Sequence, residues 1–423
     1  MIELRFGTAV QQARPPAGWR LQRLRIAPPR GERSEAAVVT AALDAAQDDL
    51  AVFLEGAGGV TVLVSDHTRL CRSEVFLPAL LARVHAAGVP VDATTLLFAC
   101  GTHRRQSEAE QRAILGDGIF ARYRVADHDC RDGQSMVEVG RTRYGTRVSV
   151  NRIAAEAERI IATGTVVHHY FAGYGGGAKL FVPGVAAYET AVQNHRRTLT
   201  ADARFHPACR DGSFEGNPVA DDIMDTLRFM PPSRAFTALL GPDGRIIDAL
   251  CGGVAEVHAA ARARVDALYR TTVSEYSDIT ITSCGGAPKD VNFIQSHKTL
   301  HRASYITKPG GSIICLAACS EGIGNTSFLP WFDVPRERLA EAIDAGYTMN
   351  AHTAVAMRDK AERFRVYLVS TLPHGEVRRM GMTPCETLQE ALDQAAATLP
   401  ADASAYLVEN GSLLVPSVEI PDA

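Results

Sequence analysis

A glycine-rich segment, HHYFAGYGGGAKLFVPG at residues 168–184, holds two histidines and one lysine within an otherwise apolar stretch. Consecutive glycines leave backbone N–H groups accessible and can form a nest for a phosphate, so Gly175, Gly176 and Gly177 are candidate cofactor contacts. Lys179 lies between apolar neighbours, where loss of water favours a neutral, nucleophilic amine. A plain surface loop with an exposed lysine explains the same residues, and the spacing is not that of a P-loop.

Four histidines follow strand-like segments in the first half of the chain: His103, His168, His169 and His195. An imidazole changes charge near neutral pH, so it serves as general acid, general base or metal ligand. A single histidine is more often structural than catalytic. The joint placement of four of them favours a site.

Polar residues in two other segments have types suited to substrate binding. DHTR at residues 66–69 supplies a carboxylate, a hydroxyl and a guanidinium, which is the side chain best suited to bidentate capture of a carboxylate or phosphate. Further on, Gln295 and Lys298 are three residues apart and therefore share one face of a helix. A surface ion pair and a solvated amphipathic helix are the respective alternatives.

The elements that must position these residues alternate between apolar strand-length runs and amphipathic helix-length stretches, the pattern of parallel α/β layers. Strands are predicted at 59–66, 93–100 and 159–167, with helices at 74–88 and after Ser107, where Glu110 completes a capping box. Ligands of parallel sheets bind outside the carboxyl ends of the strands. Asp66, His103 and His169 follow such ends and are expected to converge.

A second α/β series begins near residue 270. Its strands are predicted at 277–284, 311–319 and 363–370, and its helices at 295–306, 335–346 and 386–399. We therefore expect two α/β domains with mainly parallel sheets and the active site in the cleft between them. The expected limits are 1–268 for the N-terminal domain, 269–403 for the C-terminal domain, and 404–423 for a tail returning to the first.

Composition excludes several classes of protein. With 423 residues and a formal net charge of −4, the chain has no basic excess for nucleic-acid binding. We find no secretory signal and no apolar run long enough for a bilayer. The nine cysteines are scattered and odd in number, which favours reduced thiols and a cytoplasmic protein. Oligomeric state is not predicted.

Taken in order, DHTR, CGTHR, HHYFAGYGGGAKLFVPG, Asn194 with His195, and GGAPKDVNFIQSHKTL resemble the nickel-dependent lactate racemase family, from about residue 60 to 330. The resemblance implies a nickel-pincer nucleotide (a pyridinium-3-thioamide-5-thiocarboxylic acid mononucleotide) that carries Ni, and a small-molecule 2-hydroxy acid as substrate. Proteins that make or insert the cofactor are candidate partners.

The resemblance also implies roles for individual residues. Lys179 would form the covalent thioamide, and His195 would bind the nickel. His103 and His169 would be the acid/base pair, with Asp66, Arg69 and Lys298 as further catalytic residues. Thr68 and the glycines Gly175, Gly176 and Gly177 would contact the cofactor, and the substrate would meet Arg69, Gln295, Lys298, Ile294 and His168.

The reaction implied is inversion at C2 by reversible hydride transfer. Removal of the α-hydrogen as a hydride avoids a carbanion beside a carboxylate, and two histidines on opposite faces exchange the hydroxyl proton. Ile294 departs from the family's tyrosine, so the substrate is left open among lactate, malate, a larger apolar acid and an aldonate. His168 also departs, and a purely structural role is slightly favoured for it.

Two other functions are weighed against this one. A mononuclear zinc hydrolase would use His168, His169 and His195, but it leaves Lys179 and the glycines unused. A non-enzymatic binding protein could keep the same fold.

Overall fold

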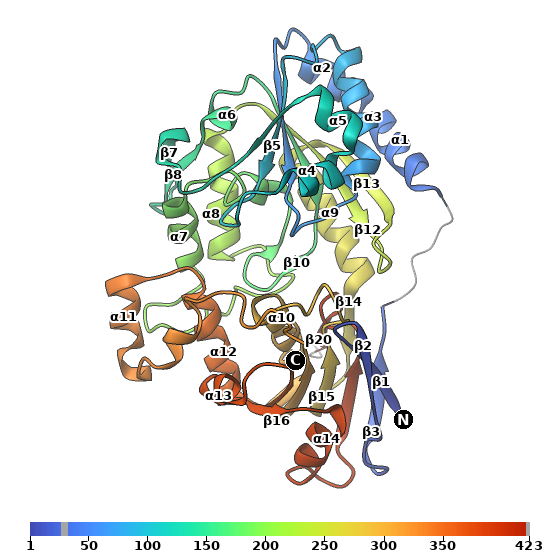
Figure 1. The fold of residues 1–423 in the computed structure, drawn as a ribbon, viewed down its shortest axis with the longest axis vertical. Coiled ribbons are helices and arrows are strands. Elements are labelled where there is room, and N and C mark those ends of the chain that lie inside the picture. Colours follow the sequence, from blue (N-terminus) through green and yellow to red (C-terminus); the bar gives the residue numbers. More distant parts are fainter. Residues whose placement is uncertain (27–32, 420–423) are drawn as a thin grey trace. The chain divides into compact units, whose positions relative to one another are not determined.

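The described chain divides into two compact units in this computed structural model, which describes residues 1–26 and 33–419. Both units are α/β, and Figure 1 labels their elements along the chain. The N-terminal unit comprises residues 33–197 and 208–267, and the C-terminal unit comprises residues 1–26, 198–207 and 268–419.

A six-stranded sheet organises the N-terminal unit, in the order β13-β12-β9-β4-β5-β6. β12, β9, β4, β5 and β6 are parallel to their neighbours, and β13 is antiparallel to β12. Every residue of β4 and β9 is buried, as expected for central strands covered on both faces. The bounds are β4 Val60–Ser65, β5 Thr94–Ala99, β6 Arg124–Asp127, β9 Ile160–Thr165, β12 Ser233–Leu240 and β13 Ile246–Gly253.

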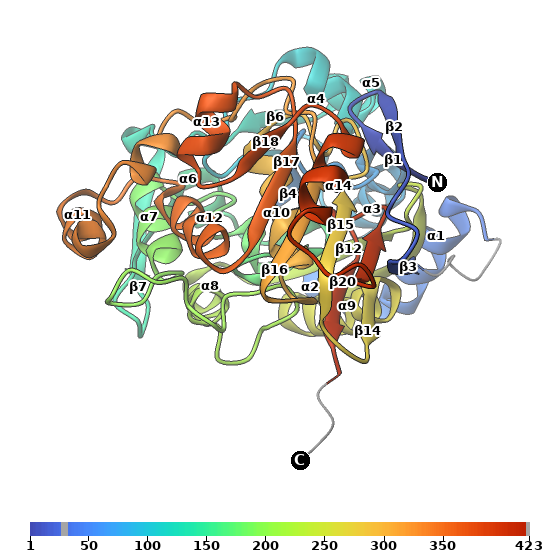
Figure 2. The ribbon, with the colours of Figure 1, turned by 90° about the horizontal axis from the view of Figure 1, so that it is seen from below.

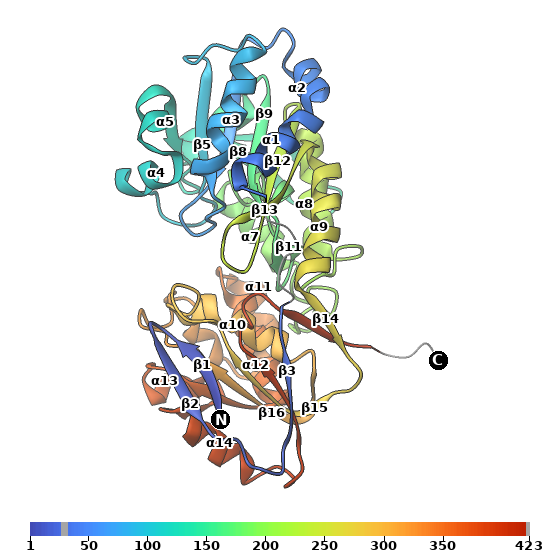
Figure 3. The same ribbon diagram turned by 90° about the vertical axis from the view of Figure 1, so that its right-hand side faces the viewer.

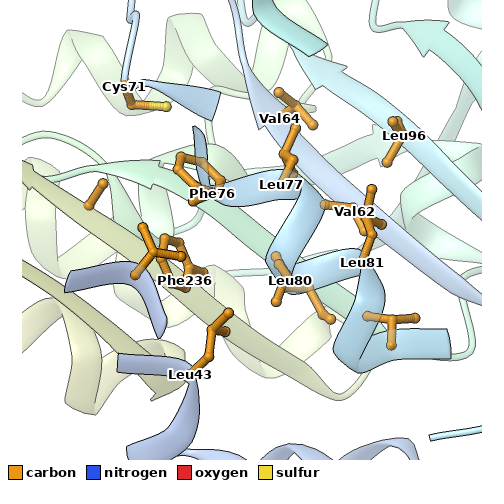
Figure 4. Packing of buried hydrophobic residues seen from close by; sticks show 14 of the residues in the cluster. Leu43, Val62, Val64, Cys71, Phe76, Leu77, Leu80, Leu81, Leu96 and Phe236 are labelled. Atoms are coloured by element: carbon orange, nitrogen blue, oxygen red, sulfur yellow. The ribbon is translucent and has the colours of Figure 1, made fainter. Parts of the chain in front are cut away.

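Alternate residues of β4 pack into separate apolar layers. Val62 and Val64 join Phe76 and Leu80 in the cluster shown in Figure 4, where helices α1 (Glu35–Ala45), α2 (Gln47–Leu54) and α3 (Ser73–Ala86) cover the sheet. Leu63 faces the opposite layer, which contains the 3-10 turn η2 (Gly177–Leu180) and helix α9 (Val254–Tyr269). The turn that carries Lys179 is therefore part of the packed core on the α9 side.

Shorter elements complete the N-terminal unit. Ser107 caps α4, and its side chain and that of Glu110 form the predicted capping box. These elements are α4 Glu108–Leu115, α5 Asp117–Arg122, η1 Gly133–Ser135, β7 Met136–Arg141, β8 Arg147–Asn151, α6 Arg152–Ala155, β10 His168–His169, β11 Gly173–Tyr174, α7 Tyr188–Arg196, α8 Pro218–Thr226 and η3 Leu227–Phe229.

The C-terminal unit is built on a parallel sheet in the order β18-β17-β16-β15-β19-β3. Helices α10 and α12 pack on one face, and α14 with the β1–β2 hairpin packs on the other (Figure 2). Its strands are β1 Ile2–Phe6, β2 Ala9–Ala13, β3 Arg20–Leu24, β14 Arg270–Val273, β15 Ser277–Ser283, β16 Thr307–Leu316, β17 Arg365–Val369, β18 Thr383–Cys385, β19 Ser404–Val408 and β20 Val415–Val418. Its helical elements are α10 Phe293–Ala303, η4 Leu329–Phe332, η5 Arg336–Arg338, α11 Leu339–Gly346, α12 Ala351–Arg363, α13 His374–Arg379 and α14 Leu388–Ala396.

The predicted fold class, two α/β units with mainly parallel sheets, is confirmed, but the unit limits differ from those expected. The first strands belong to the C-terminal unit because β3 pairs in parallel with β19 (Figure 3). The expected tail does not return to the N-terminal unit, since β20 pairs with β14 inside the C-terminal unit. Residues 420–423 of that tail, and 27–32 of the expected first domain, lie outside the described residues.

All nine cysteines are free thiols, and eight of them are buried. This agrees with the expectation of reduced cysteines. Within residues 1–26 and 33–419, no helix combines the length and apolar character needed to cross a bilayer.

Candidate active site

Three neighbouring strands deliver polar side chains to one edge of the N-terminal sheet. β9, β4 and β5 are adjacent and parallel, so their carboxyl ends share this edge. Asp66 follows β4, His103 follows β5, and His169 follows β9 in the β10–β11 hairpin. The Gly101 N–H donates to the Gly184 carbonyl over 2.8 Å, which joins the loop of His103 to the end of the glycine-rich segment.

Asp66 and His103 form a carboxylate–imidazole pair in which only the carboxylate is buried. His103 Nδ1 lies 2.5 Å from Asp66 Oδ2, and the Thr68 hydroxyl donates to Asp66 Oδ1 over 2.7 Å. Asp66 is 2% exposed, whereas the His103 side chain is 38% exposed. Because Asp66 holds Nδ1, the exposed imidazole presents Nε2 as the nitrogen available for proton transfer.

The pKa of Asp66 is lowered in spite of its burial. Burial acts to raise the pKa, but the hydrogen bond and charge of His103, the hydroxyl of Thr68 and the charge of Arg69 outweigh it. Asp66 is therefore ionised at neutral pH, and its carboxylate accepts a hydrogen bond from His103 Nδ1. These contacts give Asp66 the role of orienting His103, and they occupy the hydroxyl of Thr68.

Arg69 lies at the surface next to this pair. Its guanidinium donates to the Thr68 carbonyl over 3.1 Å, and its backbone N–H donates to the Asp66 carbonyl over 2.9 Å. The loop is thus ordered by its own backbone, with the cationic group of Arg69 at the exposed side.

Phe171 is the centre of a second cluster, which contains three of the predicted residues. Lys179 Nζ lies 3.3 Å from His169 Nε2 and 4.7 Å from the centre of the Phe171 ring. His169 and His195 both meet that ring edge-on, at centroid distances of 4.4 Å and 4.8 Å. The structure therefore brings the amine and both imidazoles around one aromatic ring.

Close packing, rather than open space, explains two of the three glycines. Gly176 and Gly177 have positive φ values of 75° and 54°. A Cβ at Gly176 would overlap the carbonyl oxygen of Thr165, and one at Gly177 would lie 2.7 Å from the ring of His258. Close packing thus requires glycine at these two positions, and their predicted contact with the cofactor stays a prediction.

Gly176→Ala should lower the melting temperature strongly, because its φ of 75° and ψ of −168° lie in a region that essentially only glycine adopts, which costs another residue about 1–3 kcal/mol before the overlap with Thr165 is counted. Gly175→Ala is the matched control, since a Cβ there would make an ordinary 3.5 Å contact with Val167. Thermal unfolding of both variants checks this. Equal melting temperatures would contradict the packing argument.

His258 of α9 packs against η2, the turn that carries Lys179, and was not predicted from the sequence. It is 4% exposed and lies against Gly177 and, at 5.3 Å between ring centroids, Phe214. Burial lowers the pKa of His258 to about 4, and the charge of Arg262 acts in the same direction. The imidazole is consequently neutral in the folded protein at neutral pH.

Acid should destabilise the N-terminal unit through His258. Between its ordinary pKa of 6.5 and the folded value of about 4, the unfolded chain binds a proton that the folded one does not. Stability must therefore fall as pH decreases through this window, with no further loss below it. Melting temperatures at pH 7 and pH 5 should differ less in His258→Gln than in wild type, with the exposed His374→Gln as control. An unchanged difference would refute this.

A buried carboxylate holds helix α7, which carries His195. Asp222 is fully buried and accepts hydrogen bonds from Thr142, Thr146 and Asn194 at 2.6–2.9 Å. Asn194 precedes His195 in the motif noted in the sequence. The asparagine therefore serves to seat the helix, and the histidine lies at its C-terminal end.

His168 does not lie where a substrate-binding residue is expected. Its side chain is 2% exposed, and Nε2 lies 2.7 Å from Asp266 Oδ1 on α9. The structure therefore supports the structural role that the sequence slightly favoured.

In the C-terminal unit, α10 carries three predicted residues. Lys298 Nζ donates to Gln295 Oε1 over 2.8 Å, so the two share one helix face as the spacing predicted. Ile294 is half-buried and packs against the apolar cluster of that unit.

Sequence reasoning missed four residues that organise the site: Phe171, Asp222, His258 and Asp266. Each acts through a contact distant in sequence. Only Phe171 lay inside a recognised motif, where its apolar type gave no signal.

The two halves of the chain match two models of one family. The model described as the lactate racemase N-terminal domain matches residues 6–206, and that of the lactate racemase C-terminal domain matches residues 272–415. The chain belongs to the lactate racemase family. It is accordingly an enzyme of the isomerase class, a racemase.

Two relatives of the family are similar over most of their length. A lactate racemase of Thermoanaerobacterium thermosaccharolyticum is 27% identical over 364 residues, covering 84% of each chain. A lactate racemase of Lactiplantibacillus plantarum is 29% identical over 371 residues, covering 86% of each chain.

Solved structures agree with the fold. The lactate racemase apoprotein of T. thermosaccharolyticum superposes with a TM-score of 0.87 at 26% identity, covering 98% of this chain and 99% of that one. A Thermotoga maritima protein superposes with a TM-score of 0.67 at 15% identity, covering 94% of this chain and 100% of that one. The latter likeness concerns the fold alone.

Proposed function

We propose that this racemase inverts the C2 centre of a 2-hydroxy acid with a nickel-pincer nucleotide attached to Lys179. The observation that carries the proposal is the cluster around Phe171, in which the Lys179 amine lies 3.3 Å from His169 and His195 meets the same ring. An amine for the tether, an imidazole for the metal and an imidazole for proton transfer are thereby gathered in one place.

The residues present fit such a group chemically. Lys179 must be neutral to form a thioamide, and His169 Nε2 is close enough to accept its proton. His195 supplies imidazole nitrogen, a ligand type that suits nickel. Held by Lys179 and His195, the nickel-pyridinium group would supply a reversible acceptor for the α-hydrogen of the substrate as a hydride.

The two histidines would act as base and acid. One accepts the hydroxyl proton as the carbon is oxidised to a planar 2-keto acid, and the other donates a proton to the carbonyl oxygen as the hydride returns. His103 is suited to this because Asp66 orients Nδ1 and leaves Nε2 exposed. His169 lies in the second cluster, on the strand that follows β9.

Substrate recognition is proposed for Arg69, Gln295 and Lys298. The exposed guanidinium of Arg69 can pair with the carboxylate of a 2-hydroxy acid. Lys298 and Gln295 are joined by a hydrogen bond and present a cation and an amide together. Ile294, next to Gln295 in the sequence, is half-buried against the apolar cluster of this unit, and a larger apolar acid stays among the proposed substrates beside lactate, malate and an aldonate.

The zinc hydrolase alternative has little support in the donor geometry. Among the described residues, no group of three or more His, Cys, Asp or Glu side chains is arranged to hold a metal ion. His168 is directed at Asp266 instead. The proposed nickel site does not require such a group, because His195 would be its one protein ligand.

Lys179→Ala should abolish covalent loading. After co-expression with the proteins that build and insert the cofactor, which we propose as partners in the cytoplasm, intact mass should show an adduct on wild type and none on Lys179→Ala. Lys298→Ala is the control, because it leaves the tether intact. An adduct retained by Lys179→Ala would contradict the assignment.

Loaded wild type should remove the optical activity of one or more enantiopure acids in a panel of lactate, malate, 2-hydroxyisocaproate and phenyllactate, or change the optical rotation of gluconate, which would become its C2 epimer. His103→Ala and His169→Ala should each lower kcat by roughly a hundredfold to ten-thousandfold, the usual contribution of a general acid or base. Polarimetry measures both. If wild type binds an acid of the panel but does not turn it over, the protein would instead be a binding protein.

A further inference from the structure

The two adjacent histidines point to opposite sides of a very short hairpin. β10 and β11 pair over two residues each, with His168 opposite Tyr174 and His169 opposite Gly173. Neighbouring residues of a strand project to opposite faces. His168 accordingly faces inward to α9, and His169 faces Lys179.

Asp266 binds both His168 and Tyr174, the cross-strand pair that faces α9. Its Oδ1 lies 2.7 Å from His168 Nε2, and the Tyr174 hydroxyl lies 2.8 Å and 2.9 Å from its two oxygens. The two rings are 5.3 Å apart. One carboxylate therefore joins both strands of the hairpin to α9.

The hairpin needs such support because a two-residue ladder is marginal by itself. The hairpin is fixed at two further places: Asn217 Nδ2 donates to the Phe171 carbonyl over 2.9 Å, and Gly212 N–H donates to the Gly173 carbonyl over 3.1 Å. A Cβ on Gly173 would overlap the Ser213 carbonyl oxygen. Residues 212–213 thus hold the hairpin at Gly173, and Asp266 holds its face toward α9.

The same face of α9 also supports the lysine turn. His258, Arg262 and Asp266 are spaced by four residues and share a face. His258 lies against Gly177, the guanidinium of Arg262 lies 5.6 Å from the Tyr174 ring centre, and Asp266 binds the hairpin. Helix α9 therefore holds the segments of His169 and Lys179 at a set separation.

We propose that Asp266 is a positioning residue for His169 and acts through His168 and Tyr174. The carboxylate does not itself touch the substrate in this role. It keeps the hairpin oriented so that the His169 imidazole meets the reacting group and the tethered amine. The expected change in kcat rests on the proposed function, whereas the expected change in the hairpin does not.

The test compares Asp266→Ala and Asp266→Asn with the control Asp248→Ala, which removes a carboxylate paired with Arg264 of the same helix. In cofactor-loaded Asp266→Ala, kcat should fall by roughly tenfold to a hundredfold with KM within about threefold, since small misplacement of a reacting group is costly. Asp266→Asn keeps an acceptor oxygen and should lie between. The adduct mass on Lys179 should be unchanged. A kcat within about twofold of wild type would overturn the proposal.

A second measurement does not depend on turnover. Amide hydrogen exchange in residues 168–174 should rise in Asp266→Ala and stay at the wild-type level in Asp248→Ala. If Asp266→Ala does not fold, Tyr174→Phe keeps the ring, removes the hydroxyl contacts with both Asp266 oxygens and should show the same effects in smaller measure. If wild type racemises no acid, the proposed function fails, while unchanged exchange in the hairpin would separately overturn the role of Asp266.

Discussion

The parallel pairing of β9, β4 and β5 is the constraint on which the candidate site depends. Backbone hydrogen bonds fix the register, with Val64 opposite Thr163 and Ser65 opposite Ala99. The Thr163 hydroxyl adds a 2.8 Å bond to the Leu63 carbonyl. Because the three strands end together, the segments that follow them have to emerge at one edge. No local preference of those segments could bring them together.

Carboxylates then orient the segments that this edge delivers. Asp66 holds the imidazole of His103, Asp222 seats the helix of His195, and Asp266 binds the hairpin of His169. A carboxylate away from water is costly unless hydrogen-bond donors surround it. Asp66 and Asp222 are buried and surrounded in this way, whereas Asp266 is 29% exposed and is bound by His168 and Tyr174. Because loss of these hydrogen bonds would cost free energy, each carboxylate restrains the residues that donate to it.

Much of the fold was predictable because its central strands and helices carry local signals. Val and Leu residues marked β4, an Ile-Ile-Ala run marked the start of β9, and Ser107 with Glu110 marked the start of α4. The first strands were not assigned to the right unit. β3 has a mixed pattern, RLQRL, and its partner β19 lies some 380 residues later. Pairing of that kind leaves no trace in local composition.

The types and order of the reactive residues, from Asp66 to Lys298, were determined by the sequence alone, together with the family to which they belong. Tertiary structure decided how each one is oriented and what it contacts. It directed His168 inward and His169 toward Lys179, and it assigned Gly176 and Gly177 to close packing. The reason is physical: a residue's type sets which chemistry is available, whereas orientation and solvent access come from contacts that are distant in the chain.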